Sequence, residues 1–273
     1  TDAIETVFGL DPFISYDVYV VAEAAATTPN LQASPTLLDV TMAGPAENAL
    51  SFDGVDDRVT IANNASITDL STNGFTLEAW IFPTDLTGNR SIIRKSGDYD
   101  LYLANGVLTM QRWNDGSNNW EIVNTPSPVP NNTWTHVAFT WTGSIGFFYI
   151  NGAESMPVPQ SSGSTVSSSA LGIGGSTSAG EYFEGLIDQV RLWSQARTLE
   201  EITSDAYTTA PSGSGLISSY IFNQSSGNVD DQIGSNDGNL SGSSGGLPFY
   251  TASTAFAADV FAPIFQVFPF ANN

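Results

Sequence analysis

The 273-residue chain contains no cysteine. A disulfide framework and a thiolate metal site are therefore excluded, and the sequence carries no redox signature of its compartment. Secreted animal modules of this size often contain disulfides, so their absence favours a bacterial exoprotein.

Basic residues are also scarce, because the chain has 7 Lys and Arg against 28 Asp and Glu, a formal net charge of −21. Phosphate binding needs clustered basic side chains, and the nearest approach to a cluster is the isolated pair Arg94-Lys95. We therefore expect no nucleic-acid partner, and an anionic membrane surface would repel the chain. Such an acidic excess is common in proteins that work in salty or calcium-rich surroundings, so calcium becomes a candidate ligand.

Long hydrophobic runs are absent as well. No run reaches the length needed to span a membrane, so we expect no membrane insertion. The first ten residues lack the basic region and the apolar stretch of a signal peptide. We interpret the chain as a mature fragment of a secreted protein.

Strand-like segments dominate what the sequence does contain. They are short, rich in β-branched and aromatic residues, and separated by clusters of Gly, Asn, Asp, Pro and Ser. This pattern predicts an all-β, antiparallel β-sandwich. One short helix is predicted over residues 198–207, where Thr198 and Glu201 have the spacing of a capping box and Leu199 and Ile202 are expected to face the core.

Two composition shifts divide the chain, at MAGPAEN near Met42 and at SGSSGG near Ser241. We predict a central domain over residues 45–246. Residues 1–44 contain two strand patterns, too few to form a sandwich alone. Residues 247–273 are predicted to be a linker followed by one strand.

Alternation along two central segments predicts which side chains share a face. In WTHVAFTW, Val137, Phe139 and Trp141 lie on the face opposite His136. In EGLIDQVRLW, the alternation places Leu186, Asp188, Val190 and Leu192 on one side and Ile187, Gln189, Arg191 and Trp193 on the other. Asp188 is thus expected among apolar neighbours, where a carboxylate is costly unless it is paired or bound to metal.

The motif order between Ala49 and Tyr207 resembles the laminin G-like and pentraxin group of the concanavalin A-like jelly rolls. The blocks that carry the resemblance are ALSFDGVDDRVTI, GFTLEAWIFPTD, SIIRKSGDYDLYLANG, NTWTHVAFTWTGSIGFFYINGA, LGIGGS and YFEGLIDQVRLWSQARTLEEI. The resemblance implies a jelly-roll β-sandwich. It also implies a calcium ion close to the acidic positions, as in some family members.

The flanking segments resemble parts of other modules. Residues 215–242 are similar to a segment that accompanies these jelly rolls in bacterial surface proteins. The N-terminal strands resemble the end of a fibronectin type III or immunoglobulin-like module, and ADVFAPIFQVFPF resembles the start of another. These likenesses imply one link of a large multidomain protein at a bacterial cell surface.

The best candidate metal site is the acidic turn of Asp53, Asp56 and Asp57. Three carboxylates within five residues suit calcium, which takes six to eight oxygen ligands in flexible geometry. Asp188 is the partner carboxylate that we add. The alternative is a turn whose Asp side chains bond their own backbone amides.

A second candidate site is the turn between two predicted strands near residue 116. Its candidate ligand-binding residues are Trp113, Asn114, Asp115, Asn118, Asn119 and Trp120, because aromatic faces stack on sugar rings and amides bond hydroxyls. The alternative is a solvated hairpin over two packed Trp side chains.

Catalysis fits the sequence poorly. His136 is the single histidine and lies on a predicted interior strand, where a Ser-His-Asp arrangement has no obvious assembly. The E-x-D-x-E pattern of paired carboxylates, typical of concanavalin A-like glucanases, is missing.

These observations leave the function open between classes. The leading hypothesis is a calcium-stabilised, non-catalytic module of a cell-surface adhesin that binds a glycan or a surface protein. The second is a structural spacer or filament segment, whose terminal strands pair with neighbouring chains or domains in a homo-oligomer or filament. An accessory domain of a carbohydrate-active enzyme is a third.

Overall fold

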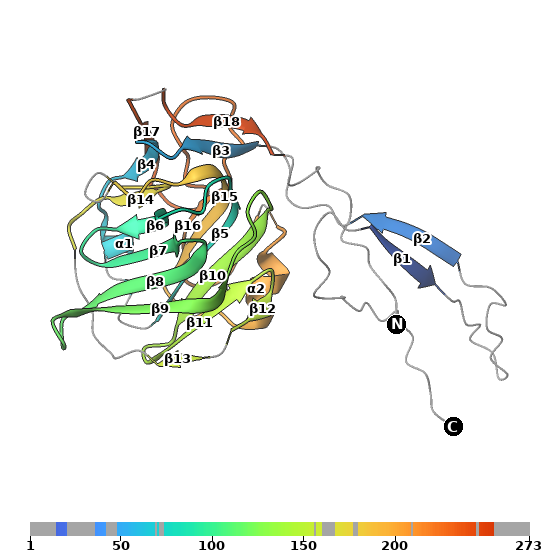
Figure 1. Cartoon of the computed structure of the whole chain (residues 1–273), viewed down its shortest axis with the longest axis horizontal. Coiled ribbons are helices and arrows are strands. Elements are labelled where there is room, and N and C mark those ends of the chain that lie inside the picture. The colour runs from blue at the N-terminus through green and yellow to red at the C-terminus, as the bar shows by residue number, and fades with distance from the viewer. Residues whose placement is uncertain are drawn as a thin grey trace. The chain divides into compact units, whose positions relative to one another are not determined.

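The computed structural model divides the chain into two compact units, Thr1–Ala46 with Thr254–Asn273, and Glu47–Ser253. The described residues are 48–68, 70, 74–155, 157–159, 167–176, 180–208, 210–243 and 246–253, and the backbone of 15–20 and 36–41 (Figure 1). Within them, no helix has the length and apolar character that a membrane span requires.

The first unit contributes one hairpin to the described residues. Strand β1 (Ser15–Val20) pairs antiparallel with β2 (Thr36–Thr41). Both strands predicted near the N-terminus are therefore present. The strand predicted in ADVFAPIFQVFPF lies outside the described residues, and the assignment of both flanks to fibronectin or immunoglobulin-like modules stays a prediction.

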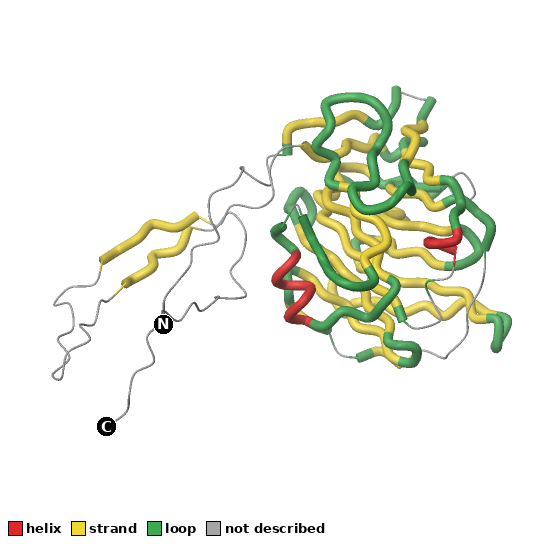
Figure 2. The backbone as a smooth tube through the Cα atoms, turned by 180° about the vertical axis from the view of Figure 1, so that it is seen from behind, coloured by secondary structure: helices red, strands yellow, loops and turns green. Residues whose placement is uncertain are grey.

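The second unit is a sandwich of two antiparallel sheets, as the strand pattern predicted (Figure 2). The back sheet has nine strands and the order β12-β11-β10-β5-β15-β3-β18, with β13 on β11 and β16 on β15. The front sheet has seven strands and the order β17-β4-β14-β6-β7-β8-β9.

The strand bounds follow from the backbone pairing. The back-sheet strands are β3 (Asn48–Asp53), β5 (Phe75–Pro83), β10 (Thr135–Trp141), β11 (Ile145–Ile150), β12 (Ala153–Glu154), β13 (Val158–Pro159), β15 (Glu184–Trp193), β16 (Leu216–Tyr220) and β18 (Phe249–Ala252). The front-sheet strands are β4 (Arg58–Ile61), β6 (Asn89–Lys95), β7 (Tyr99–Ala104), β8 (Val107–Asn114), β9 (Asn119–Pro128), β14 (Leu171–Ile173) and β17 (Gly238–Ser241).

The core lies between the two sheets. Alternate residues of β7 (Tyr99, Leu101 and Leu103) belong to it, and from β10 it takes Val137, Phe139 and Trp141. The predicted alternation in β10 is thus confirmed. His136, on the opposite face, is also buried, because the outer face of the back sheet is itself covered over this strand.

Helix α2 (Leu199–Asp205) provides that cover. Thr198 and Glu201 form the predicted capping box, which satisfies backbone N–H groups at the helix start. Ile202 is buried against Ala138 and Tyr149 of the back sheet. Leu199 is 41% exposed, so the prediction that it faces the core was wrong. A second helix, the four-residue α1 (Ala65–Thr68), was not predicted, since one helical turn has no periodic signature.

Strand β15 departs from the predicted alternation. Gln189 has a φ of 46°, and the pairing of β15 with β5 shifts register between Asp188 and Arg191. This bulge reverses the phase of the strand, so that Ile187, Val190 and Leu192 all belong to the core. The predicted grouping of Leu186 and Asp188 with Val190 was therefore wrong.

The sandwich extends beyond the predicted boundary at residue 246. Strand β18 pairs with β3, and Ala252 lies opposite Asn48. Residues 249–252, which the sequence assigned to a linker, therefore supply a strand of this sheet. The first and last strands of the sandwich are neighbours.

Candidate functional site

The outer face of the front sheet is built by residues that alternate with the core residues of its strands. Leu108 and Met110 of β8 point into the core, so Thr109, Gln111 and Trp113 point outward. One row of cross-strand partners runs over the whole sheet. Its members are Asn239, Thr60, Gly172, Arg94, Asp100, Gln111 and Ile122.

Two shorter rows flank this long row on the strands β6 to β9. One pairs Trp113 with Trp120. The other contains Ser91, Tyr102, Thr109 and Asn124. Rows on one face are about 7 Å apart and neighbouring strands about 5 Å apart, so the three rows form a patch about 14 Å across.

Residues 174–176 and 180–183 border this patch. A side chain at Gly172 would collide with the carbonyl oxygen of Gly175, so the chain after β14 lies close against this strand. Further along the chain, the carbonyl oxygen of Glu181 accepts a hydrogen bond from the N–H of Ser91, at 3.0 Å. Glu181 is thereby held beside β6.

Arg94 joins two carboxylates at the centre of the long row. Its Nη1 donates to Asp100 Oδ2 at 2.8 Å and also to Glu181 Oε2. Ser91 Oγ donates to Asp100 Oδ1 at 2.7 Å, and Gln111 Nε2 lies 3.4 Å from Asp100 Oδ2. The cluster thus contains one guanidinium and two carboxyl groups.

Asp100 is 1% exposed, although it lies on the outer face. Burial raises its pKa from the ordinary 3.8 to about 7, against the opposing effects of Arg94 and Ser91. The carboxyl group therefore titrates near neutral pH.

The two predicted Trp residues lie at the end of this face. The Trp113 and Trp120 rings are 5.4 Å apart, edge to face at 76°, and both side chains are partly exposed. Trp113 Nε1 donates to Asp115 Oδ1 at 3.0 Å, which fixes the indole. The two rings are neither fully exposed for sugar stacking nor fully packed beneath the hairpin, because they contact each other and still reach solvent.

The three Asn residues predicted to bind a ligand in this hairpin instead stabilise its turn. Asn114 is 1% exposed, so it is not the surface residue that the sequence suggested. It points away from Trp113, where its Nδ2 donates to Glu121 and its Oδ1 accepts from the N–H of Ser117. Asn118 has a φ of 51°, a turn conformation that Asn tolerates. Asn119 is exposed and accepts from the N–H of Trp120.

The acidic turn brings three of the four predicted metal ligands together. One ligand oxygen each of Asp53, Asp56 and Asp57 lies within 4.8 Å of the others. Much of their capacity is already used, since Asp53 Oδ1 accepts from the N–H groups of Val55, Asp56 and Asp57 at 2.9 to 3.4 Å. Asp56 accepts from the N–H of Ser243 at 3.0 Å. The self-bonding turn therefore accounts for part of the cluster.

Asp57 differs from its neighbours. It is 4% exposed, and among the described residues its Oδ1 is buried with no hydrogen-bond partner. A side chain at Gly242 would fill the space between Asp57 Oδ1, Asp56 Oδ1 and the carbonyl oxygen of Gly246. Burial and the charge of Asp53 raise the pKa of Asp57 to about 6. Such a buried, unsatisfied oxygen group fits a hard cation.

Asp188 does not join this turn. Glu184 pairs with Asp53 and contacts Gly54, whereas Asp188 is four residues further along β15, or about 13 Å. It is buried beside the bulge, where burial raises its pKa well above the ordinary value and the N–H of Gln189 donates to its Oδ1. The β15 carboxylate beside the turn is therefore Glu184, which the sequence did not indicate as a metal ligand.

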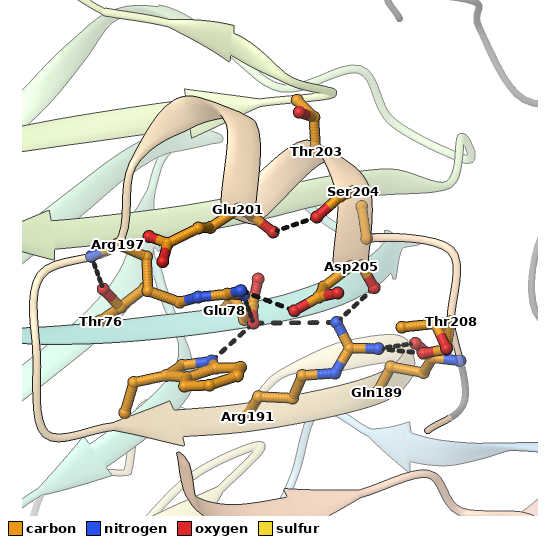
Figure 3. A network of polar contacts seen from close by, with 12 residues as sticks. Thr76, Glu78, Gln189, Arg191, Arg197, Glu201, Thr203, Ser204, Asp205 and Thr208 are labelled. Carbon is orange, nitrogen blue, oxygen red and sulfur yellow. Dashed lines mark hydrogen bonds and ion pairs between the residues drawn. The ribbon is translucent and has the colours of Figure 1, made fainter. Parts of the chain in front are cut away.

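A second charged cluster is sealed under helix α2 (Figure 3). Glu78 is fully buried and faces Arg191 and Arg197 at 3.7 and 3.6 Å, and His136 Nε2 at 3.4 Å. Burial alone would raise the pKa of Glu78, but His136 and the two Arg charges lower it to about 2. Trp193 Nε1 also donates to Glu78. These contacts join the helix segment to the back sheet, and no solvent reaches His136.

A family model described as the concanavalin A-like lectin/glucanases superfamily, of laminin G type, matches residues 53–203, more than half of the chain. The chain belongs to this superfamily. The resemblance identified from the sequence blocks is thus confirmed, and the superfamily match ends within α2.

Solved structures with this fold include a candidate carbohydrate-binding protein from Bacteroides ovatus. It is 19% identical, has a TM-score of 0.65, and the match covers 91% of this chain and 72% of that one. A pentraxin from Limulus polyphemus is 16% identical with a TM-score of 0.47, covering 63% and 87%. Domain 4 of an extracellular arabinanase from Geobacillus stearothermophilus, solved with arabinotriose, is 21% identical with a TM-score of 0.47, covering 62% and 84%. No curated protein sequence matches the chain.

Sequence reasoning missed the Arg94, Asp100 and Glu181 cluster of this superfamily member. Alternation of Tyr99, Leu101 and Leu103 as core residues would have turned Asp100 outward. Glu181, however, lies 87 residues from Arg94, and no local pattern links them. Only the pairing of the segment before β15 with β6 brings them together.

Proposed function

We propose that this chain is a non-catalytic, glycan-binding module of an extracellular adhesin at a bacterial surface. The glycan binds on the outer face of the front sheet, centred on β8 and β9, where Gln111, Trp113 and Trp120 are partly exposed. The observation that carries the proposal is the partly exposed pair of Trp113 and Trp120 beside a row of polar side chains on one sheet face. Indole faces stack on sugar rings, and the polar groups bond hydroxyls.

The comparisons support this choice of ligand. The superfamily is described by lectins and glucanases, and the fold is similar to that of a candidate carbohydrate-binding protein. Fold similarity alone does not set function, and the aromatic and polar side chains of this face are what favour a glycan.

Two features of the charged side chains support a binding role over catalysis. His136 is sealed beneath α2 and cannot meet a substrate. Asp100 and Glu181, the two carboxylates on the proposed binding face, are bridged by Arg94, which opposes their use as a free acid and nucleophile.

The ends of the sandwich favour a pendant module over an in-line spacer. Asn48 of the entering strand lies opposite Ala252 of the leaving strand, so the chain enters and leaves the sandwich at one place. A spacer that transmits length along a filament is better served by connections at opposite ends. The partly exposed part of the front sheet's outer face, over β8 and β9, is then left for a ligand.

Calcium binding at the acidic turn is part of the proposal. The residues that would hold the ion are Asp53, Asp56 and Asp57, and Glu184 lies beside them. The unsatisfied Asp57 Oδ1 supports this assignment. A bound divalent ion would offset the repulsion among the carboxylates and fix the turn between β3 and β4.

The test is a glycan array followed by titration calorimetry on the full chain. We expect binding to at least one oligosaccharide, and a loss of about tenfold or more in affinity for Trp113→Ala and Trp120→Ala. Phe249→Ala is the matched control, because Phe249 is a 61% exposed aromatic residue on the back sheet. Circular dichroism and thermal melting would verify that each variant is folded.

Two results would contradict the proposal. One is the absence of binding across a broad panel with calcium present. The other is glycan binding that both Trp variants leave unchanged while Phe249→Ala removes it. A surface-protein ligand would be indicated if cell adhesion required the Trp pair but no glycan bound.

A further inference from the structure

The polar half of the proposed binding face has an unusual charge arrangement. Arg94 Nη1 is shared between Asp100 and Glu181, and Asn89 Nδ2 also donates to Glu181, at 2.9 Å. The Nε of Arg94 is buried and has no hydrogen-bond partner within the described part of the chain. The guanidinium is thus held in place by two carboxylates and still has an unsatisfied donor.

This cluster lies beside the Trp pair on the same face. Gln111 is two residues before Trp113 on β8, and its cross-strand partner is Asp100, which in turn pairs with Arg94. Adjacent rows are about 7 Å apart, so a ring stacked at Trp113 would bring its substituents to Gln111 and the Arg94 cluster.

The charges decide which ligand can be accepted there. An arginine that binds a sugar carboxylate needs its paired N–H groups free for a bidentate contact. Here both carboxylates share Nη1 and the Nε is buried, so the guanidinium offers a ligand no accessible pair of N–H groups. An incoming anion would meet the partly exposed carboxylate of Glu181. The net charge of −21 adds long-range repulsion of polyanions.

We propose that Arg94, Gln111 and Glu181, positioned by the buried Asp100, form the polar subsite of the glycan-binding face and that this subsite selects uncharged over acidic sugars. The inference rests on the proposed function and names its ligand class. Hydroxyl groups both donate and accept, so they match the Glu181 carboxylate, the Gln111 amide and the guanidinium together. A uronate or sialate carboxylate only accepts and is repelled.

The experiment compares matched ligands. Titrations with neutral oligosaccharides and with uronic-acid oligosaccharides of the same linkage, together with sialylated glycans, would be run on the full chain. We expect the neutral ligands to bind and the acidic ligands to bind at least about tenfold more weakly. Gln111→Ala should weaken neutral binding about threefold to tenfold, because one amide contact is lost.

The charge itself is tested by Glu181→Gln. This variant removes one negative charge beside Arg94, so we expect the preference for neutral ligands to fall by about threefold or more. Glu200→Gln is the matched control, since Glu200 is an exposed carboxylate in the first turn of α2. It should leave the preference unchanged.

The outcomes separate this inference from the proposed function. A preference for acidic glycans would overturn the inference and leave glycan binding intact. Neutral binding that requires Trp113 but is unaffected by both Gln111→Ala and Glu181→Gln would also overturn it. Failure of every glycan to bind would instead remove the proposed function.

Discussion

Arg94 and Asp100 face each other across β6 and β7, with Nη1 to Oδ2 at 2.8 Å, on the sheet face that points away from the core. An outward-facing Asp is normally solvated, yet Asp100 is 1% exposed. The pair therefore combines a surface position with a buried environment. Water therefore screens the attraction between Arg94 and Asp100 less than it screens a solvated ion pair, and the burial of Asp100 carries a desolvation cost.

Asp100 makes stability depend on pH in a direction opposite to that of most carboxylates. Its pKa is about 7 in the folded protein and near 3.8 when unfolded, so the folded state binds more protons between these values. Stability should therefore fall as pH rises from about 4 to about 7, by up to roughly 4 kcal/mol for this group. Urea unfolding of wild type and Asp100→Asn at pH 5 and pH 8 measures it.

The variant isolates the contribution of this one carboxyl group. Relative to wild type, Asp100→Asn should be more favourable at pH 8 than at pH 5, because Asn carries no charge to desolvate. Asp230→Asn, at an exposed position, is the control and should show no such change. Equal differences at the two pH values would show that Asp100 is ionised throughout.

Glu78 should behave in the opposite way. Its pKa is lowered from 4.5 to about 2, so its contribution is complete above pH 4.5 and is lost as pH falls toward 2. Glu78→Gln leaves Arg191 and Arg197 without their central anion, and we expect a loss of about 3 to 5 kcal/mol at pH 7. Chemical denaturation measures the loss, with Glu200→Gln as the control. A change below about 1 kcal/mol would mean that Asp205 and backbone acceptors suffice for the two arginines.

Calcium should raise the thermal stability of the chain. At a concentration about 100 times the dissociation constant, an ion that binds only the folded state adds about 2.7 kcal/mol. Asp57→Asn should melt normally without calcium and lose this response, because its buried oxygen is the least satisfied of the three. Asp230→Asn should keep the response. An identical transition for wild type with calcium and with chelator would rule out the ion.

The sandwich should fold when excised. Its core clusters, both sheets and the pairing of Asn48 with Ala252 all lie within Glu47–Ser253. A fragment of these residues is expected to show one cooperative unfolding transition and the same glycan affinity as the full chain. A shorter fragment that ends at residue 246 lacks β18 and should be less stable. Loss of cooperativity in the longer fragment would show that the flanks complete the fold.

Local sequence signals determined the strands, the helix cap and the superfamily. Alternation in β10 reflects a side-chain period of two, and the Thr198–Glu201 box reflects hydrogen bonds three residues apart. Both are short-range constraints that a sequence displays directly. The acidic turn was found for the same reason, since Asp53, Asp56 and Asp57 are close along the chain.

Tertiary structure decided which of these residues can act together. The bulge at Gln189 reversed the phase of β15, and Asp188 was separated from the acidic turn because their strand positions differ by four residues. Asn114 was buried by its contact with Glu121. Arg94 met Glu181 across 87 residues of sequence. Such partnerships depend on strand register and chain crossing, which are set by packing of the whole sandwich and leave no periodic trace in the sequence.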